Sequence, residues 1–147
     1  VTSTDLPSIV PLLSSNLRRN LQSLAAGGDA PRLGSSTVFA WDWTVESPEG
    51  FDPPYDMVIA TDCVFSLALV NDLVRCILAC CHARTEVYVC HEIRDESIND
   101  AFKEALKQQF VVKTISMSKL HPEYRHELVV MLYAKPIPSI ISSRLDA

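Results

Sequence analysis

Four acidic side chains stand directly after short apolar or β-branched runs of the sequence, at the points where such runs would end as strands. They are Asp5, Asp42, Asp62 and Glu92. In open α/β sheets, ligands bind just beyond the carboxyl ends of the strands, so side chains in these positions share one edge. Carboxylates accept hydrogen bonds from hydroxyls and amines, and a row of them attracts cations. The spacing therefore predicts an acidic ligand edge that suits a cationic substrate.

The first two carboxylates each leave two interpretations open. Asp5, in the string Thr4-Asp5-Leu6-Pro7, could accept both hydroxyls of a nucleotide-like ribose, or it could cap the helix that follows. Trp43 could stack on a purine ring while Asp42 accepts a hydrogen bond from an exocyclic amine. Alternatively, Trp41 and Trp43 could both pack on the edge of the sheet.

The roles of the other two carboxylates are also left open by the sequence. Asp62 ends a nearly continuous apolar run, and a carboxylate is costly to bury without a partner. It therefore either caps the following helix or points into a pocket. Glu92 is followed closely by Arg94, and a pair between the two would be purely structural.

The elements that must position these side chains follow from hydrophobic periodicity. A repeat of three to four residues predicts helices, and short apolar or β-rich runs predict strands. Three helices are predicted. The first begins near Pro11 and ends at Gly27-Gly28, and the second runs from Phe65 to Cys81. The third runs from Ser97, a candidate N-cap, to Gln109. The predicted strands are Val1–Thr4, Thr37–Trp41, Met57–Ala60, Thr85–His91, Phe110–Met117 and Glu127–Ala134.

This order alternates strands and helices, which is typical of a doubly wound, mostly parallel α/β sheet. Met57–Ala60 is apolar throughout, as expected for a parallel strand buried on both faces. No helix separates the last two strands, so we expect the terminal strand to insert antiparallel. Residues 136–147 are predicted to be a tail with little structure.

Composition narrows the classes of function. The 147 residues carry a net charge of −5 and no basic cluster larger than Arg18-Arg19, which argues against binding to nucleic acid or an anionic membrane. No apolar run reaches the roughly 18 residues that a membrane span needs. Five cysteines, an odd number set mostly in apolar runs, favour a reduced cytoplasmic or nuclear protein. Their spacing does not predict a metal site.

Several strings, taken in order, resemble the seven-β-strand protein-lysine methyltransferases called family 16. They are Thr4-Asp5-Leu6-Pro7 with the downstream Asn16, Asp42-Trp43, the run from Tyr55 through Asp62 to Phe65, Glu92-Ile93-Arg94, and the segment from Phe110 through His121-Pro122-Glu123-Tyr124-Arg125 to Lys135. The resemblance extends over residues 1–135, with residues 136–147 as a tail. It implies a Rossmann-like sheet with an antiparallel last strand, and S-adenosylmethionine as the cofactor.

The resemblance also implies roles for individual residues. Asp5 matches the acidic residue that holds the cofactor ribose, and Asp42 and Trp43 match the adenine-contacting motif. Thr61 matches a small residue whose backbone lines the cofactor site. Asp62 to Phe65 matches an Asp-x-x-Tyr motif near the channel for the target lysine. The implied partner is a protein that presents a lysine, with a chaperone or an ATPase as candidates, and not a nucleic acid or a membrane.

Two departures from the family pattern affect what the chain can do. Phe65 replaces the family's tyrosine, so the aromatic wall stays but the hydroxyl is lost. The glycine-rich loop that follows the family's first strand is absent, because it would lie before Val1 together with that strand. We therefore expect the chain to be the carboxyl-terminal part of a methyltransferase domain, either from an incomplete sequence or as an inactive truncated product.

Two alternative functions stay open beside protein-lysine methylation. A methyltransferase acting on a small molecule or another residue would use the same cofactor site, and Phe65 keeps this alternative open. A binding or scaffold remnant that has lost the cofactor is the non-enzymatic alternative. A nicotinamide-dependent dehydrogenase would share the logic of the sheet, but no segment matches a substrate domain or a hydride-transfer site.

Overall fold

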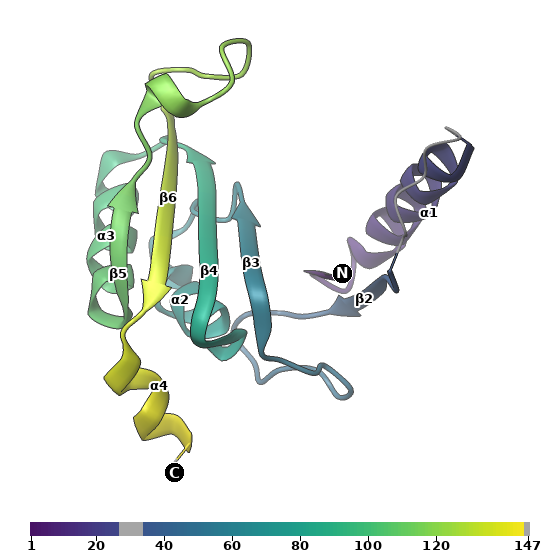
Figure 1. Ribbon diagram of the computed structural model, residues 1–147, viewed down its shortest axis with the longest axis horizontal. Helices are drawn as coiled ribbons and strands as arrows, with labels where there is room; N and C mark the ends of the chain where they lie inside the picture. The colour runs from purple at the N-terminus through teal and green to yellow at the C-terminus, as the bar shows by residue number, and fades with distance from the viewer. Residues whose placement is uncertain (27–33, 146–147) are drawn as a thin grey trace. The chain divides into compact units, whose positions relative to one another are not determined.

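The computed structural model describes residues 1–26 and 34–145, which fall into two compact units. Unit 1 comprises Val1–Phe51 and unit 2 comprises Asp52–Ala147. Each is an α/β assembly by itself (Figure 1). Among the described residues, no helix is long and apolar enough to cross a membrane.

Unit 1 is a single β-α-β segment. Strand β1 (Thr2–Asp5), helix α1 (Val10–Ala26) and strand β2 (Thr37–Ala40) follow one another, and the two strands pair in parallel. Pro11 lies in the first turn of α1, where a missing backbone N–H removes no helical hydrogen bond. The start of the helix agrees with the sequence prediction, whereas its predicted end at Gly27-Gly28 lies outside the described residues. No side chain of α1 is buried.

Unit 2 is a four-stranded mixed sheet in the order β3-β4-β6-β5. Its strands are β3 (Tyr55–Thr61), β4 (Cys81–Glu92), β5 (Phe110–Thr114) and β6 (Val129–Pro136). Strand β3 pairs with β4 in parallel, and β6 lies between β4 and β5, antiparallel to both. The predicted α/β class and the antiparallel insertion of the last strand are therefore confirmed.

The core of unit 2 lies between one face of this sheet and two helices, α2 (Val70–Ala79) and α3 (Glu96–Gln109), which Figure 1 shows behind the strands. A short 3-10 helix, η1 (Leu67–Leu69), leads into α2. Alternate residues are buried along β4 from Thr85 to His91 and along β6 from Val130 to Pro136, as the two-residue period of a strand requires. The fully buried side chains of this core include Val87, Val89, Phe102, Leu106, Phe110 and Leu132.

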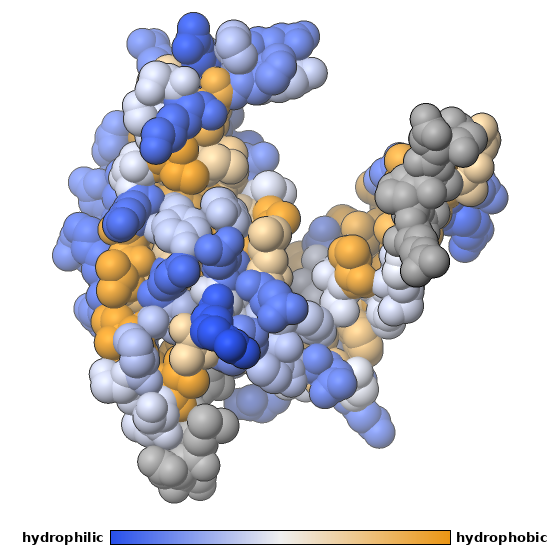
Figure 2. Space-filling model, viewed as in Figure 1, coloured by the Kyte–Doolittle hydropathy of each residue, from blue (hydrophilic) through white to orange (hydrophobic). Residues whose placement is uncertain are grey.

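The opposite face of the sheet has two parts. On β3, Met57 and Ile59 are exposed and lie opposite Glu86 and Tyr88 of β4. At the centre, the Tyr133 hydroxyl donates to Glu86 Oε1 (2.9 Å), and the Tyr88 and Tyr133 rings are 5.3 Å apart. Figure 2 shows this face with a hydrophilic centre flanked by hydrophobic patches.

Four local expectations were wrong. Strand β3 is not buried on both faces, because Met57 and Ile59 are exposed. Asp95, not Ser97, is the N-cap of α3, because its side chain accepts hydrogen bonds from the Ser97 and Ile98 backbone N–H groups. The predicted helix from Phe65 begins later, with η1. The predicted tail contains helix α4 (Pro138–Leu145), which begins at a proline, a favourable first residue, and buries Ile141.

Candidate active site

The carboxyl ends of β1 and β2 bring three predicted site residues to one edge of unit 1. Asp5 is paired with Ala40, and the Trp41 N–H donates to the Asp5 carbonyl (2.8 Å). Asp42 and Trp43 therefore begin the turn directly beside Asp5. The Asp5 carboxylate accepts the N–H of Leu6 (2.8 Å), before α1 begins at Val10. It thus bonds the backbone just beyond the strand rather than the first turn of the helix.

The two tryptophans of this edge differ in burial. Trp41 is only 4% exposed, packs against Phe51 with ring centroids 4.8 Å apart, and donates from Nε1 to the Val45 carbonyl (3.4 Å). Trp43 is half-buried. The packing interpretation therefore holds for Trp41, while Trp43 keeps accessible surface.

Asp42 is held by a local turn. Its Oδ1 accepts from the Thr44 backbone N–H (2.9 Å) and from the Thr44 hydroxyl (2.8 Å). These two hydrogen bonds, the backbone one first, lower the pKa of Asp42 below its ordinary value. The side chain is therefore a fixed, ionised acceptor.

The carboxyl ends of β3 and β4 bring the remaining predicted residues to one edge of unit 2. Asp62 follows β3 with a φ of 53°, in the left-handed region that aspartate enters more readily than most residues. Its N–H donates to the Cys90 carbonyl (2.9 Å), and its Oδ1 accepts from the Glu92 N–H (3.4 Å). Asp62 therefore bridges two strand ends and caps no helix.

The other residues of this edge are open to solvent. Thr61 is exposed and pairs with Cys90 of β4, and its carbonyl accepts from the Cys63 thiol (3.3 Å). Phe65 is 51% exposed. Glu92 forms the ion pair with Arg94 that the sequence suggested, with 3.9 Å between Oε2 and Nε.

An open pocket of about 430 Å³ lies at this edge of unit 2. Its lining residues come from the ends of three strands and from the loop before β6: Asp62, Cys90, His91, Glu92, His126 and Val129. Sequence reasoning found Asp62 and Glu92 but missed both histidines. The available signal was the antiparallel last strand, which brings the residues before β6 to the carboxyl ends of β3 and β4.

Burial keeps two side chains of the pocket, His91 and Cys90, in their uncharged forms. His91 is 2% exposed, its Nε2 lies 3.3 Å from Asn99 Oδ1, and its Nδ1 is a buried atom with no hydrogen-bond partner. Desolvation lowers the pKa of His91, so the ring is neutral at neutral pH. Desolvation, with a smaller contribution from the charge of Asp62, raises the pKa of the Cys90 thiol. Cys90 therefore stays protonated and is a poor nucleophile.

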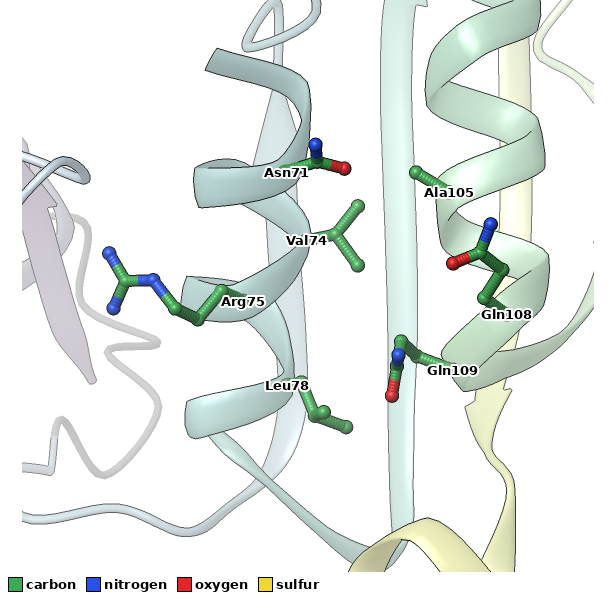
Figure 3. A pocket seen from close by; sticks show the side chains of 7 residues that line it. All are labelled: Asn71, Val74, Arg75, Leu78, Ala105, Gln108 and Gln109. Atoms are coloured by element: carbon green, nitrogen blue, oxygen red, sulfur yellow. The ribbon is translucent and has the colours of Figure 1, made fainter.

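A second hollow, of about 260 Å³, lies between α2 and α3 on the helical side of unit 2. Figure 3 shows Val74 and Leu78 of α2 pointing toward α3, with Gln108 and Gln109 on the facing helix. None of the predicted site residues lines it. The candidate active-site residues are thus those at the strand ends.

Comparisons with known proteins identify the family and the fold of this chain. A family model described as lysine methyltransferase matches residues 1–109. Among solved structures, a putative rRNA-methylase from Clostridium thermocellum has a TM-score of 0.60 and 12% identity, over 93% of this chain and 72% of that one. The N-methyltransferase NodS from Bradyrhizobium japonicum has a TM-score of 0.57 and 9% identity, over 92% and 73%. Human N-acetylserotonin methyltransferase in complex with SAM has a TM-score of 0.53 and 12% identity, over 92% and 40%.

Proposed function

The chain belongs to the lysine methyltransferase family, and from this premise we propose that it transfers a methyl group from S-adenosylmethionine to a lysine side chain of a protein. The observation that carries the proposal is the pocket at the carboxyl edge of unit 2, where Asp62 and Glu92 are the acidic lining residues. Two carboxylates complement the ammonium group of lysine. They also disfavour a phosphate-bearing substrate such as RNA.

The residues at the strand ends have the chemistry that an adenosyl group requires. When bound, S-adenosylmethionine supplies an electrophilic methyl group on a sulfonium. Asp5 would accept from the ribose hydroxyls, since a carboxylate has about four acceptor positions and the Leu6 N–H uses one. Asp42 is a fixed acceptor for an exocyclic amine, and Trp43 has accessible indole surface. On unit 2, the backbone of Thr61 is the group that we propose for a cofactor contact.

The work of the protein in this reaction is to position the amine. Asp62 and Glu92 orient the lysine ammonium before its proton leaves for solvent, and the neutral amine is then the nucleophile. Phe65 contributes an apolar wall at the same edge. In favourable cases such positioning supplies roughly 7–11 kcal/mol of the barrier. No covalent nucleophile is needed, which agrees with the protonated state of Cys90.

A further strand, from residues before Val1, is part of this proposal. Strands β1 and β3 each stand at the edge of their sheet, and each pairs with one neighbour only among the described strands. An edge strand exposes unpaired N–H and C=O groups, so a further strand paired with either edge would satisfy them. A coding sequence upstream of Val1 with a strand followed by a glycine-rich turn would support this. Its absence would favour the truncated product instead.

The proposal also includes the class of the substrate protein and its place in the cell. Within the family, residues 110–135 resemble the valosin-containing-protein lysine methyltransferase most, so an ATPase or chaperone substrate in the cytoplasm or nucleus is the partner we propose.

The second candidate function is methylation of a small molecule. It is favoured by Phe65, which lacks the family's hydroxyl, and by the fold shared with N-acetylserotonin methyltransferase.

The test uses the full-length gene product, labelled S-adenosylmethionine and a cell lysate. We expect a labelled protein whose label resides on lysine, and at least about a tenfold loss of transfer in Asp62→Asn. Asp56→Asn is the matched control, because this exposed carboxylate lies at the other end of the same strand. Label found only in small products would replace the proposal by its second candidate.

A binding measurement separates the enzyme from the remnant that has lost its cofactor. Calorimetry with S-adenosylhomocysteine should show binding to the full-length product, weakened in Asp5→Ala and in Trp43→Ala. Glu46→Ala, an exposed carboxylate of the same unit, is the control. Wild-type affinity in both test variants would refute the assigned cofactor residues, and no binding at all would favour the remnant.

A further inference from the structure

Large apolar side chains gather in two exposed segments at the carboxyl edge of unit 2. The first segment leads from β3 to α2 and exposes Phe65 (51%) and Leu67 (60%). The second is the loop of residues 115–128 between β5 and β6, which exposes Met117 (41%), Tyr124 (73%) and Leu128 (41%). Exposed aromatic and apolar groups that cluster on loops are typical of binding surfaces.

The topology of the sheet places the second segment at the candidate active site. Strands β4 and β5 are both antiparallel to β6, so β5 runs in the same direction as β3 and β4. The loop that follows β5 must therefore lie at their carboxyl ends, as Figure 1 shows. His126 of this loop lines the same pocket as Asp62 and Glu92.

Backbone hydrogen bonds shape part of the loop and tie one end of it to unit 2. The N–H groups of Tyr124 and Arg125 both donate to the His121 carbonyl (3.1 Å each), and the Tyr124 ring lies 5.1 Å from the His121 ring. At its far end, the Ile93 N–H donates to the Leu128 carbonyl (2.7 Å), which ties the loop to the segment after β4. An aromatic side chain presented in this way loses little conformational entropy on binding.

His126 is oriented as a hydrogen-bond donor. Its Nδ1 accepts the backbone N–H of Leu128 (3.3 Å), so the neutral ring carries its proton on Nε2. In this tautomer the Nε2 of His126 is available to donate to a carbonyl of a bound chain. A donor beside two carboxylates can fix the main chain of a segment whose lysine enters the pocket.

The charges of the loop and pocket favour a cationic partner over a phosphate-bearing one. Lys119 and Arg125 balance Glu123 and Glu127, and Arg94 balances Glu92, with which it forms an ion pair. The carboxylate of Asp62 then leaves a small negative surplus at the pocket, which disfavours phosphate groups of nucleic acids and anionic lipids. A lysine flanked by apolar side chains has the complementary pattern of a central cation and an apolar surround.

We propose that loop 115–128 recognises the protein segment around the target lysine. In this proposal Tyr124, assisted by Met117 and Leu128, binds an apolar side chain next to that lysine. This inference rests on the proposed function and adds a sequence preference to it. Tyr124 acts in substrate binding, apart from the methyl transfer itself. Its loss should therefore change KM and leave kcat largely intact.

The experiment measures methyl transfer by the full-length gene product to a peptide library that has a central lysine and varied flanking residues. Wild-type protein should prefer peptides with an apolar or aromatic neighbour of the lysine. Tyr124→Ala should raise KM for these peptides about 10–30-fold, the effect of losing one interface anchor, with kcat within about twofold. Tyr124→Phe should restore most of the affinity.

Two controls keep the result specific. Val111→Ala removes a comparably exposed side chain from β5, outside the loop, and should leave KM unchanged. Affinity for S-adenosylhomocysteine should be the same in all variants, which shows that the cofactor residues are intact.

The remaining outcomes contradict either the inference about loop 115–128 or the proposed function. Equal KM values for wild type, Tyr124→Ala and Val111→Ala, with peptides still methylated, would overturn the inference and leave the proposed function standing. Transfer to lysate proteins but to no peptide would overturn the inference, because a short segment around the lysine would then not be sufficient for recognition. No transfer to any lysine would refute the proposed function itself. Binding to phosphatidylserine vesicles that Tyr124→Ala abolishes would assign the loop to a membrane instead.

Discussion

Units 1 and 2 are built from the same parallel β-α-β pattern, yet they differ in what they bury. Among the described residues of unit 1, Trp41 alone is buried, and α1 presents no buried side chain. Unit 2 buries alternate residues of its central strands under two helices. A two-stranded sheet is marginally stable by itself, whereas a four-stranded sheet with packed helices holds its own core. Unit 2 therefore holds a core of its own, whereas unit 1 by itself buries little.

The distribution of aromatic residues lets each unit be followed separately. Both tryptophans, Trp41 and Trp43, lie in unit 1, and all four tyrosines lie in unit 2. Tryptophan fluorescence therefore reports on unit 1, and the near-ultraviolet ellipticity of tyrosine reports on unit 2. If the units differ as described, the tryptophan transition comes at lower urea than the tyrosine transition.

The largest expected effect is the loss of a core side chain of unit 2. Phe102→Ala removes a fully buried ring and should lower the free energy of unfolding of unit 2 by about 3–5 kcal/mol, measured by urea titration of tyrosine ellipticity. Leu12→Ala, at a position of α1 that is 59% exposed, should change stability by no more than about 0.5 kcal/mol. Similar costs in the two variants would break the comparison between the units.

An intermediate effect is expected at the start of α3. Asp95→Ala removes the acceptor for two backbone N–H groups and should lower the Tm of unit 2 by about 4–8 °C. Asp95→Asn keeps a good capping residue and should retain most of the wild-type Tm. Tryptophan fluorescence should not respond to either substitution, because the cap belongs to unit 2. A Tm unchanged in Asp95→Ala would show that the cap is unimportant there.

The smallest effect is a dependence of unit 2 on pH. Burial lowers the pKa of His91 in the folded state, so the unfolded chain binds the proton more readily as the pH falls below about 6.5. The stability linked to His91 is therefore present at neutral pH and lost on acidification. Thermal unfolding at about pH 7.5 and pH 5.5 should show a fall in Tm that is smaller in His91→Gln. His121→Gln, on the exposed loop, should behave like wild type, and equal falls in both variants would contradict the assignment.

The order of strands and helices was predictable because apolar periodicity reports which residues face a core. The stripe that became α2 is a long, regular signal in unit 2. The run Met57–Ala60 correctly predicted a strand but not its burial on both faces, since Met57 and Ile59 are exposed. Local capping was less predictable, since Asp95 and Ser97 are both acceptable N-caps and only the backbone geometry chooses between them. Helix α4 was missed because its short sequence has little periodicity, and the burial of Ile141 against the rest of unit 2 supports it.

The candidate site was predictable only in part. The rule for strand ends found Asp5, Asp42, Asp62 and Glu92. It could not find His91 or His126, because the first lies within a strand and the second precedes one by three residues. His126 reaches the pocket because β6 inserts between β4 and β5, whereas His91 belongs to β4 and directly precedes Glu92.

The sequence by itself determined the α/β class, the acidic residues at the strand ends and the net negative charge, because these depend on residue type and short-range spacing. Only the tertiary structure decided that Asp62 bridges two strands, that Trp41 is packed while Trp43 keeps accessible surface, and that the loop with Tyr124 borders the pocket. The physical reason is that hydrogen bonds and burial between residues far apart in sequence depend on strand order and register. Local propensity carries no record of either.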